Sequence, residues 1–183
     1  MAAAKLVALV LVCCWPLLGR AAVTTDNPWL VKAAYLFNFA KYVEWPTTRF
    51  TSTNDPICIG VLGDDPFGVA LDNVVKNRTA QQRPVTILRA KKVEELLACH
   101  IVYIGASEQT RLVQILSQLR KLPVLTVGEQ RDFLEQGGMV RLRTQRQSVV
   151  FDVHLPAADT AQLKLSARLL ENAQSVIRKA TPE

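Results

Sequence analysis

Histidine is scarce in this 183-residue chain, which holds only His100 and His154, and this scarcity excludes several kinds of site. Two histidines cannot complete a conventional zinc site without carboxylates, and the sequence singles out no carboxylates for that role. A dinucleotide fingerprint is also missing, because residues 60–63 (GVLG) have no third glycine and no glycine-rich turn. We therefore predict that the protein holds no metal and no cofactor.

Signatures of nucleophilic catalysis are missing as well. Cys99 and His100 are neighbours in the sequence, and neighbours on a strand point to opposite faces, so they cannot form a nucleophile pair. Ser107 and Ser166 have no nucleophile-elbow context. Each histidine is therefore interpreted as a core or surface residue, and we predict that the protein is not an enzyme.

The N-terminal segment has the pattern of a secretory signal peptide. Lys5 precedes an apolar run over residues 6–18, and small residues follow around Ala21, where cleavage is expected. The run is shorter than the roughly 20 apolar residues of a membrane-spanning helix. We predict export, with a signal peptide over residues 1–21 and one domain over residues 22–183.

Export changes how charge is interpreted. The formal net charge is +6, but without Lys5 and Arg20 it becomes +4, from 20 basic and 16 acidic side chains. The basic residues are scattered along the chain, which indicates a solvated surface of mixed charge. No nucleic-acid partner is expected.

Short apolar segments alternate with helical patterns through most of the chain. A helix over residues 29–43 is apolar on nearly every side, so it is either buried or docks onto something. The alternation predicts an α/β fold with a mainly parallel, flavodoxin-like sheet flanked by helices. The expected strands are 57–63, 83–88, 100–104 and 123–127, and the expected helices between them are 67–76, 93–97 and 107–122.

The C-terminal part departs from this alternation. Residues 138–142 and 149–155 predict an antiparallel β-hairpin extension, with the polar region 143–147 between the strands. A terminal helix is expected over residues 166–179, where leucine, valine and isoleucine recur at helical spacing.

The mature chain keeps two cysteines, Cys58 and Cys99, in a compartment where disulfides persist. Each precedes the core of a strand, and a flavodoxin-like order 2-1-3-4 makes those two strands neighbours. Neighbouring strands lie about 4.8 Å apart, which a disulfide tolerates. A structural disulfide is therefore predicted; two buried thiols and a redox switch are the alternatives.

Four blocks of the chain, taken together with its C-terminal hairpin and helix, resemble the YfiR family of periplasmic proteins. Residues 31–46 (VKAAYLFNFAKYVEWP) look like the opening helix of that family. The other matching segments are 57–63, 99–105, 123–129, 138–139, 150–153 and 169–170, so the resemblance covers essentially the whole mature chain.

The resemblance implies a soluble periplasmic repressor, usually a homodimer. Such a repressor binds the periplasmic sensory domain of an inner-membrane diguanylate cyclase, and an outer-membrane lipoprotein releases it. The family's best-known member has a disulfide at positions that match Cys58 and Cys99, whereas Arg141 stands where a second disulfide would need a cysteine. Its partner-facing surface corresponds here to Val140, Asp152 and Ala158; Ala158 replaces a larger apolar residue, and the alternative is that Val140 and Asp152 are ordinary hairpin residues.

The function predicted on this basis is binding rather than turnover. The alternative is a small-molecule receptor that uses the crevice at the carboxyl ends of the strands, near Asp64, Asp65 and Gly105. The same aspartates could equally serve as a plain helix N-cap. Saturable binding of a metabolite to the isolated domain would favour the receptor, and tight binding to a sensor domain would favour the repressor.

Overall fold

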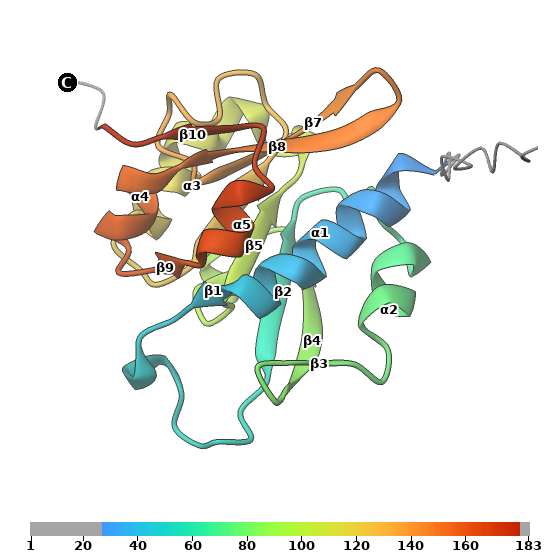
Figure 1. The fold of residues 1–183 in the computed structure, drawn as a ribbon, viewed down its shortest axis with the longest axis vertical. Coiled ribbons are helices and arrows are strands. Elements are labelled where there is room, and N and C mark those ends of the chain that lie inside the picture. Colours follow the sequence, from blue (N-terminus) through green and yellow to red (C-terminus); the bar gives the residue numbers. More distant parts are fainter. Residues whose placement is uncertain (1–26, 180–183) are drawn as a thin grey trace, which may run out of the picture.

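A computed structural model describes residues 27–179, and the predicted signal peptide over residues 1–21 lies outside the described residues. The described chain forms an eight-stranded sheet with helices on both faces (Figure 1). Its strand order is β10-β8-β7-β6-β5-β2-β4-β3. The strands are β2 (Ile57–Leu62), β3 (Thr79–Ala80), β4 (Arg83–Ala90), β5 (Ile101–Ile104), β6 (Leu125–Gly128), β7 (Val140–Gln145), β8 (Ser148–His154) and β10 (Ser175–Ile177).

The centre of the sheet confirms the predicted flavodoxin-like order. Strands β4, β2, β5 and β6 lie side by side and are all parallel, which is the order 2-1-3-4. β7 continues the parallel run beside β6, and β8 then pairs with β7 in the antiparallel sense. The mixed α/β class with a C-terminal hairpin follows from these pairings.

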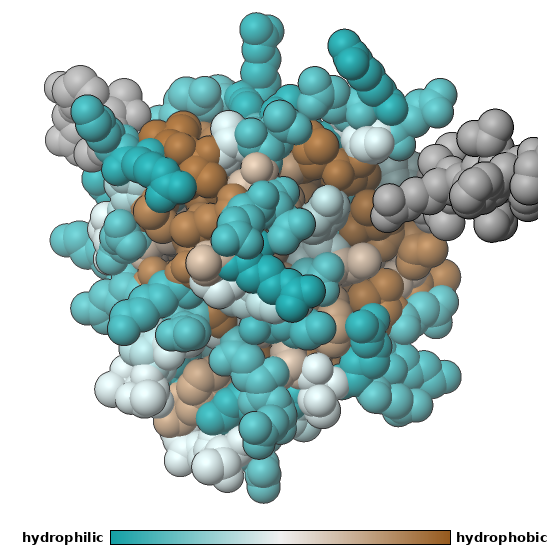
Figure 2. All heavy atoms as spheres, viewed as in Figure 1, coloured by the Kyte–Doolittle hydropathy of each residue, from teal (hydrophilic) through white to brown (hydrophobic). Residues whose placement is uncertain are grey.

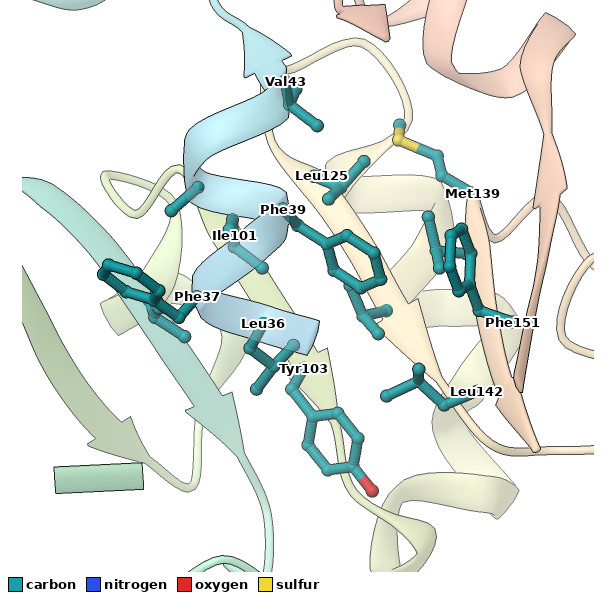
Figure 3. Packing of buried hydrophobic residues seen from close by; sticks show 14 of the residues in the cluster. Leu36, Phe37, Phe39, Val43, Ile101, Tyr103, Leu125, Met139, Leu142 and Phe151 are labelled. Atoms are coloured by element: carbon teal, nitrogen blue, oxygen red, sulfur yellow. The ribbon is translucent and has the colours of Figure 1, made fainter. Parts of the chain in front are cut away.

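Helix α1 (Pro28–Tyr42) covers one face of the sheet. Asn27 caps it by accepting a hydrogen bond from the backbone N–H of Trp29 at 2.9 Å. The chain becomes extended at Val43, three residues before Pro46. Figure 3 shows side chains of α1 pointing at the sheet, with Phe39 facing Phe151 of β8. The short helix α2 (Val69–Val75) lies beside α1 on this face and contributes to the same core.

A second apolar cluster covers the opposite face. It is formed by η2 (Val93–Leu96), α3 (Leu112–Leu119) and Phe133 and Leu134 after β6 against the sheet, and η3 (Ala106–Arg111) leads into α3. The four side chains predicted to share one face of α3 are all buried: Leu112, Ile115, Leu116 and Leu119. Both faces of the central strands are therefore dry, which explains their nearly continuous apolar sequence.

The C-terminal hairpin is tighter than the sequence indicated. β7 and β8 extend through residues 143–145 and 148, and only Arg146 and Gln147 form the turn, both with positive φ. The polar region is therefore mostly strand rather than loop. Its side chains alternate between the two faces of a sheet extension that reaches into solvent, where polar residues are tolerated.

The prediction of one terminal helix over residues 166–179 is wrong in its extent. Helix α5 (Ala167–Glu171) is capped by Ser166 and ends at Asn172. Residues Ser175–Ile177 instead form β10, which pairs in parallel with β8 at the edge of the sheet. The remaining elements are η1 (Thr47–Arg49), α4 (Leu155–Thr160) and a small antiparallel pair, β1 (Val43–Glu44) with β9 (Lys164–Leu165).

The predicted disulfide joins Cys58 and Cys99, whose Cα atoms are 4.7 Å apart. Beside it, the backbone N–H of Cys58 donates to Nδ1 of His100 at 3.1 Å, and the His100 ring stacks on Phe50. Burial, reinforced by the charges of Arg49 and Arg83, lowers the pKa of His100 to about 4. His100 is therefore a neutral core residue that supports the crosslinked end of β2 and β5.

No helix in the described part of the chain, residues 27–179, is long and apolar enough to span a membrane.

We expect the Cys58→Ser, Cys99→Ser double variant to lose about 4 kcal/mol of unfolding free energy, because the disulfide closes a loop with a sequence separation of 41. Urea denaturation followed by circular dichroism measures the difference. A reductant should destabilise the wild type and leave the variant unchanged. Equal stability of the oxidised wild type and the variant would contradict a structural role for the crosslink.

Candidate functional site

A groove lies between α1 and α5 and has a volume of about 360 Å³. Its floor is apolar and aromatic, and its edges carry polar side chains. β8 contributes Phe151 to the floor, so three segments that are distant in the sequence meet here. The lining consists of Val31, Ala34, Tyr35, Asn38, Phe39, Tyr42, Phe151, Arg168, Leu169 and Asn172.

Aromatic contacts fix the floor of this groove. The Tyr35 ring stacks on Phe39 with centroids 6.1 Å apart, and it meets Phe151 edge to face at 5.2 Å. The Tyr35 hydroxyl donates to the backbone carbonyl of Val149 at 3.2 Å, which ties α1 to the hairpin. Tyr35 remains partly exposed, so the groove presents an aromatic surface. The ring contacts and the hydrogen bond to Val149 hold this ring in place.

The rim of the groove is polar. Arg168 projects from α5, Asn172 follows the helix as its C-cap, and the Arg168 guanidinium lies 5.4 Å from the centroid of the Tyr42 ring on the opposite wall. Asn38 completes the polar edge on α1. Figure 2, drawn from the side on which α1 and α5 are seen, shows apolar patches separated by polar side chains. An apolar centre with a polar rim is the usual composition of a protein–protein interface.

A second feature is the charged network under the hairpin. Asp152 is 1% exposed and accepts hydrogen bonds from Arg143 at 2.6 and 3.0 Å and from Arg141 at 3.0 and 3.3 Å. The Ser175 hydroxyl of β10 also donates to it, at 2.7 Å. One carboxylate thus joins β7, β8 and β10. With two arginines on one aspartate, this cluster of three charged side chains has a net charge of +1.

These hydrogen bonds set the ionisation of Asp152. Burial alone would raise the pKa of its carboxyl group, but the hydrogen bonds from Arg143, Ser175 and Arg141 outweigh that effect and lower the pKa to about 2. Asp152 is therefore charged at every pH at which the protein is expected to work.

The three predicted partner-facing residues all lie below the surface. Val140 and Ala158 are fully buried, and Asp152 is covered by the arginines and by Ser175. Asp152 directly follows Phe151, which forms the groove floor. Val140 and Ala158 therefore belong to the main core, and Asp152 holds the hairpin and β10 together.

The predicted crevice residues lie together, as expected for the carboxyl ends of β2 and β5. The carboxylate of Asp64 pairs with Lys91 at 2.5 Å, and that of Asp65 pairs with Arg89 at 2.6 Å. Gly105 lies against the backbone of Asp64, where a Cβ atom would come within 2.9 Å of a carbonyl oxygen. The backbone of Asp64 thus fills the space beside Gly105. The carboxylates of Asp64 and Asp65 are both engaged in ion pairs with neighbouring basic side chains.

The same end of the sheet holds a polar cluster that the sequence analysis missed. Lys32, which is buried in α1, donates to Glu129 at 2.6 Å, and the Tyr103 hydroxyl donates to the other carboxylate oxygen at 2.8 Å. Burial and the adjacent Glu129 carboxylate raise the pKa of Tyr103. The only sequence signal was a lysine within an otherwise apolar stretch. The cluster fixes the angle of α1 on the sheet.

Within residues 27–179, no group of three or more histidine, cysteine, aspartate or glutamate side chains is placed to hold a metal ion.

Comparison with known proteins identifies a family. The sequence profile described as YfiR/HmsC-like matches residues 30–174. No curated protein matches the chain. Among solved structures, a conserved domain protein from Vibrio cholerae O1 biovar eltor is similar at 11% identity and a TM-score of 0.46, over 66% of this chain and 54% of that chain. The chain thus spans about half the length of that protein.

We expect acid to weaken the hairpin through Asp152. Its pKa in the folded state, about 2, lies below the unfolded value near 4, so its contribution to stability is present above pH 4 and is lost as the pH falls towards 2. The Asp152→Asn variant should be less stable than the wild type at pH 6, by about 2 kcal/mol. Urea denaturation at pH 6 and pH 2.5 should show this gap narrowing in acid. A gap that does not depend on pH would contradict the ionic account.

Proposed function

This chain belongs to the YfiR/HmsC-like family, and we propose that it is a periplasmic regulatory protein that binds and represses the sensory domain of an inner-membrane diguanylate cyclase. The YfiR-like family is known for periplasmic regulators of such cyclases rather than for catalysis. Repression would lower cyclic di-GMP and disfavour biofilm. Homodimer formation, and release by an outer-membrane lipoprotein, belong to the same proposal.

The groove between α1 and α5 is the observation that carries this proposal. It offers the partly exposed rings of Tyr35 and Tyr42, held from beneath by the buried Phe39 and Phe151, with the exposed Arg168 at its rim. Aromatic residues and arginine supply most of the binding energy at protein interfaces when they lie at the centre of a contact and water is excluded. Phe39 and Phe151 are already buried, so a partner that inserts an apolar side chain between α1 and α5 would cover the partly exposed rings of Tyr35 and Tyr42.

The surroundings of the groove suit a rigid binding surface. The Asp152 network joins β7, β8 and β10 behind Phe151, and the Cys58–Cys99 disulfide links β2 to the segment that leads into the neighbouring strand β5. Little conformational freedom then remains to be lost on binding, which favours affinity. A disulfide also fits a protein that works in an oxidising compartment.

Repression by this protein would be a shift of population. A sensor domain that exchanges between active and inactive forms is held inactive only by a ligand that binds the inactive form more tightly. The proposed contact therefore involves a surface that the sensor presents in one of its two forms. No chemical step is required of the regulator.

We expect deletion of the gene to raise intracellular cyclic di-GMP, and expression of the wild-type protein to reverse the rise. The Arg168→Glu variant should fail to reverse it, because the substitution inverts an exposed charge at the groove rim without touching the core. Calorimetry with the isolated sensor domain should show affinity at least tenfold weaker for this variant, equivalent to about 1.4 kcal/mol.

Lys121→Glu is the matched control, because it makes the same charge change at an exposed position that follows α3, on the other face of the sheet. It should behave as the wild type in both assays. An unchanged cyclic di-GMP level on deletion, under conditions where the protein is expressed, would refute the proposed function. Equal loss of binding in both variants would refute the location of the interface.

A further inference from the structure

One edge of the eight-stranded sheet is open. β4 is the last long strand on that side (Figure 1), and the short strand β3 beyond it pairs only with Arg83 and Pro84. The side chain of Gln81, in the turn between β3 and β4, donates to two backbone carbonyls at the end of α1, at 2.8 and 2.7 Å, which holds the turn in place. Residues 86–90 therefore have no strand on their outer side in the described part of the chain. This outer side of residues 86–90 is the open edge.

The backbone groups of β4 point alternately towards β2 and towards the open edge. The carbonyl of Ala90 accepts from the N–H of Gly63, directly after β2, at 3.0 Å, so Ala90 and Leu88 face β2. Ile87 and Arg89 consequently face outwards. Among the described residues, no hydrogen bond reaches the backbone N–H or C=O of these two residues from outside the sheet. Two donors and two acceptors are thus free at the edge, which is a template for another strand.

Apolar side chains flank the open edge on both faces of the sheet. Leu88 is 42% exposed on the face that carries η2 and α3. Val69 is 75% exposed at the start of α2 on the other face, next to a backbone carbonyl to which Arg89 donates at 3.1 Å. The charge of Arg89 is neutralised, because its guanidinium pairs with Asp65 at 2.6 Å and with Asp72 at 2.9 Å. The open edge therefore lacks the unpaired charge, the proline or the bulge that commonly protects a free edge.

The open edge is complementary to a second copy of itself. In an antiparallel pair, two outward-facing residues that lie opposite each other exchange both N–H···O bonds. When Leu88 of one copy lies opposite Leu88 of another, Ile87 of each copy lies opposite Arg89 of the other. Four hydrogen bonds then pair every free backbone group of these residues in both copies.

Other symmetric registers fit less well. With Ile87 opposite its own copy, Arg89 would lie opposite Val85, a position to which Arg78 already leads into β3. A shift in the other sense would place Ile87 opposite Lys91, beyond the end of β4. The structure thus leaves the register centred on Leu88 as the one that pairs both outward-facing residues.

We propose that the open edge of β4 is the interface between two copies of this chain, which pair in the antiparallel sense about a two-fold axis at Leu88 and join two sheets into one. The axis is perpendicular to the sheet, so the two Leu88 side chains meet on the same face, at a non-hydrogen-bonded position where opposite side chains lie closest. This inference rests on the homodimer in the proposed function and gives that homodimer its interface.

The open edge is separate from the groove between α1 and α5, because no residue of β4 lines that groove. Dimer formation is measured on the protein alone, whereas repression is measured as cyclic di-GMP in the cell. A monomeric protein that still represses would overturn this inference and leave the proposed function intact.

Sedimentation velocity of the purified protein, between about 1 and 300 μM, brackets the micromolar Kd expected of a small interface. We expect a dimer that dissociates on dilution. Leu88→Lys and Leu88→Glu should each weaken the dimer at least tenfold, because like charges then face each other across the axis. An equimolar mixture of the two variants should restore the dimer, since a lysine then faces a glutamate. Val113→Lys, at an exposed apolar position in α3, should behave as the wild type.

Cysteine crosslinking tests the register. Leu88→Cys should form a dimer under mild oxidation, because Cα atoms at this kind of opposed position lie about 4.5 Å apart, which a disulfide accepts. Thr86→Cys, at an exposed position in the same strand, is the matched control. Its two copies would lie four residues apart along the pair, about 13 Å, and should remain uncrosslinked.

The proposal is overturned if the wild type stays monomeric over this range, or if folded Leu88→Lys protein dimerises as the wild type does. Thermal unfolding shows which variants are folded. Equal crosslinking of the two cysteine variants would overturn the register. Slower hydrogen exchange at the amides of Ile87 and Arg89 only after the sensor domain is added would assign the open edge to a strand of that partner, and would overturn self-pairing.

Discussion

The contact between helix α1 and the sheet is the constraint on which the rest of the structure depends. Leu36, Phe37 and Phe39 are buried in the main core, and Phe39 meets Phe151 of β8 with ring centroids 5.3 Å apart. Each such side chain contributes roughly 1.5–3 kcal/mol when it is buried. The same helix then turns Tyr35 and Asn38 towards α5. One element therefore closes the core and forms a wall of the candidate interface.

Polar contacts define how α1 sits on this apolar base. The buried Lys32 pairs with Glu129 near one end of the helix, and Tyr35 donates to the hairpin at Val149. A buried ion pair contributes little net stability, since desolvation offsets the attraction, but breaking one is costly. These contacts fix the position and rotation of the helix, and with them the width of the groove.

Much of the fold could be predicted from the sequence, because its central strands are short, apolar and separated by helical patterns. The order of those strands and the Cys58–Cys99 pair follow from this arrangement and are confirmed. The end of the chain was harder to predict. Val176 and Ile177 continue a helical spacing in the sequence, yet they pair with β8, more than twenty residues away. Local periodicity contains no information about such a partner.

The candidate sites were less predictable than the fold. The nearly uniform apolarity of residues 29–43 did indicate a helix with surface to dock, and the groove beside α1 agrees with that expectation. Its other wall comes from α5, more than 120 residues further along the chain. Asp152 was selected through a family resemblance, and its burial became visible only when Arg141, Arg143 and Ser175 were seen around it.

Hydrogen–deuterium exchange of the protein, recorded with and without the sensor domain of its cyclase, tests the central claim most directly. The account predicts that the partner slows exchange in residues 35–42 and 167–172, on the two walls of the groove, and leaves α3 unchanged. Protection confined to α3 and the segment after β6, with no change in α1 or α5, would contradict it.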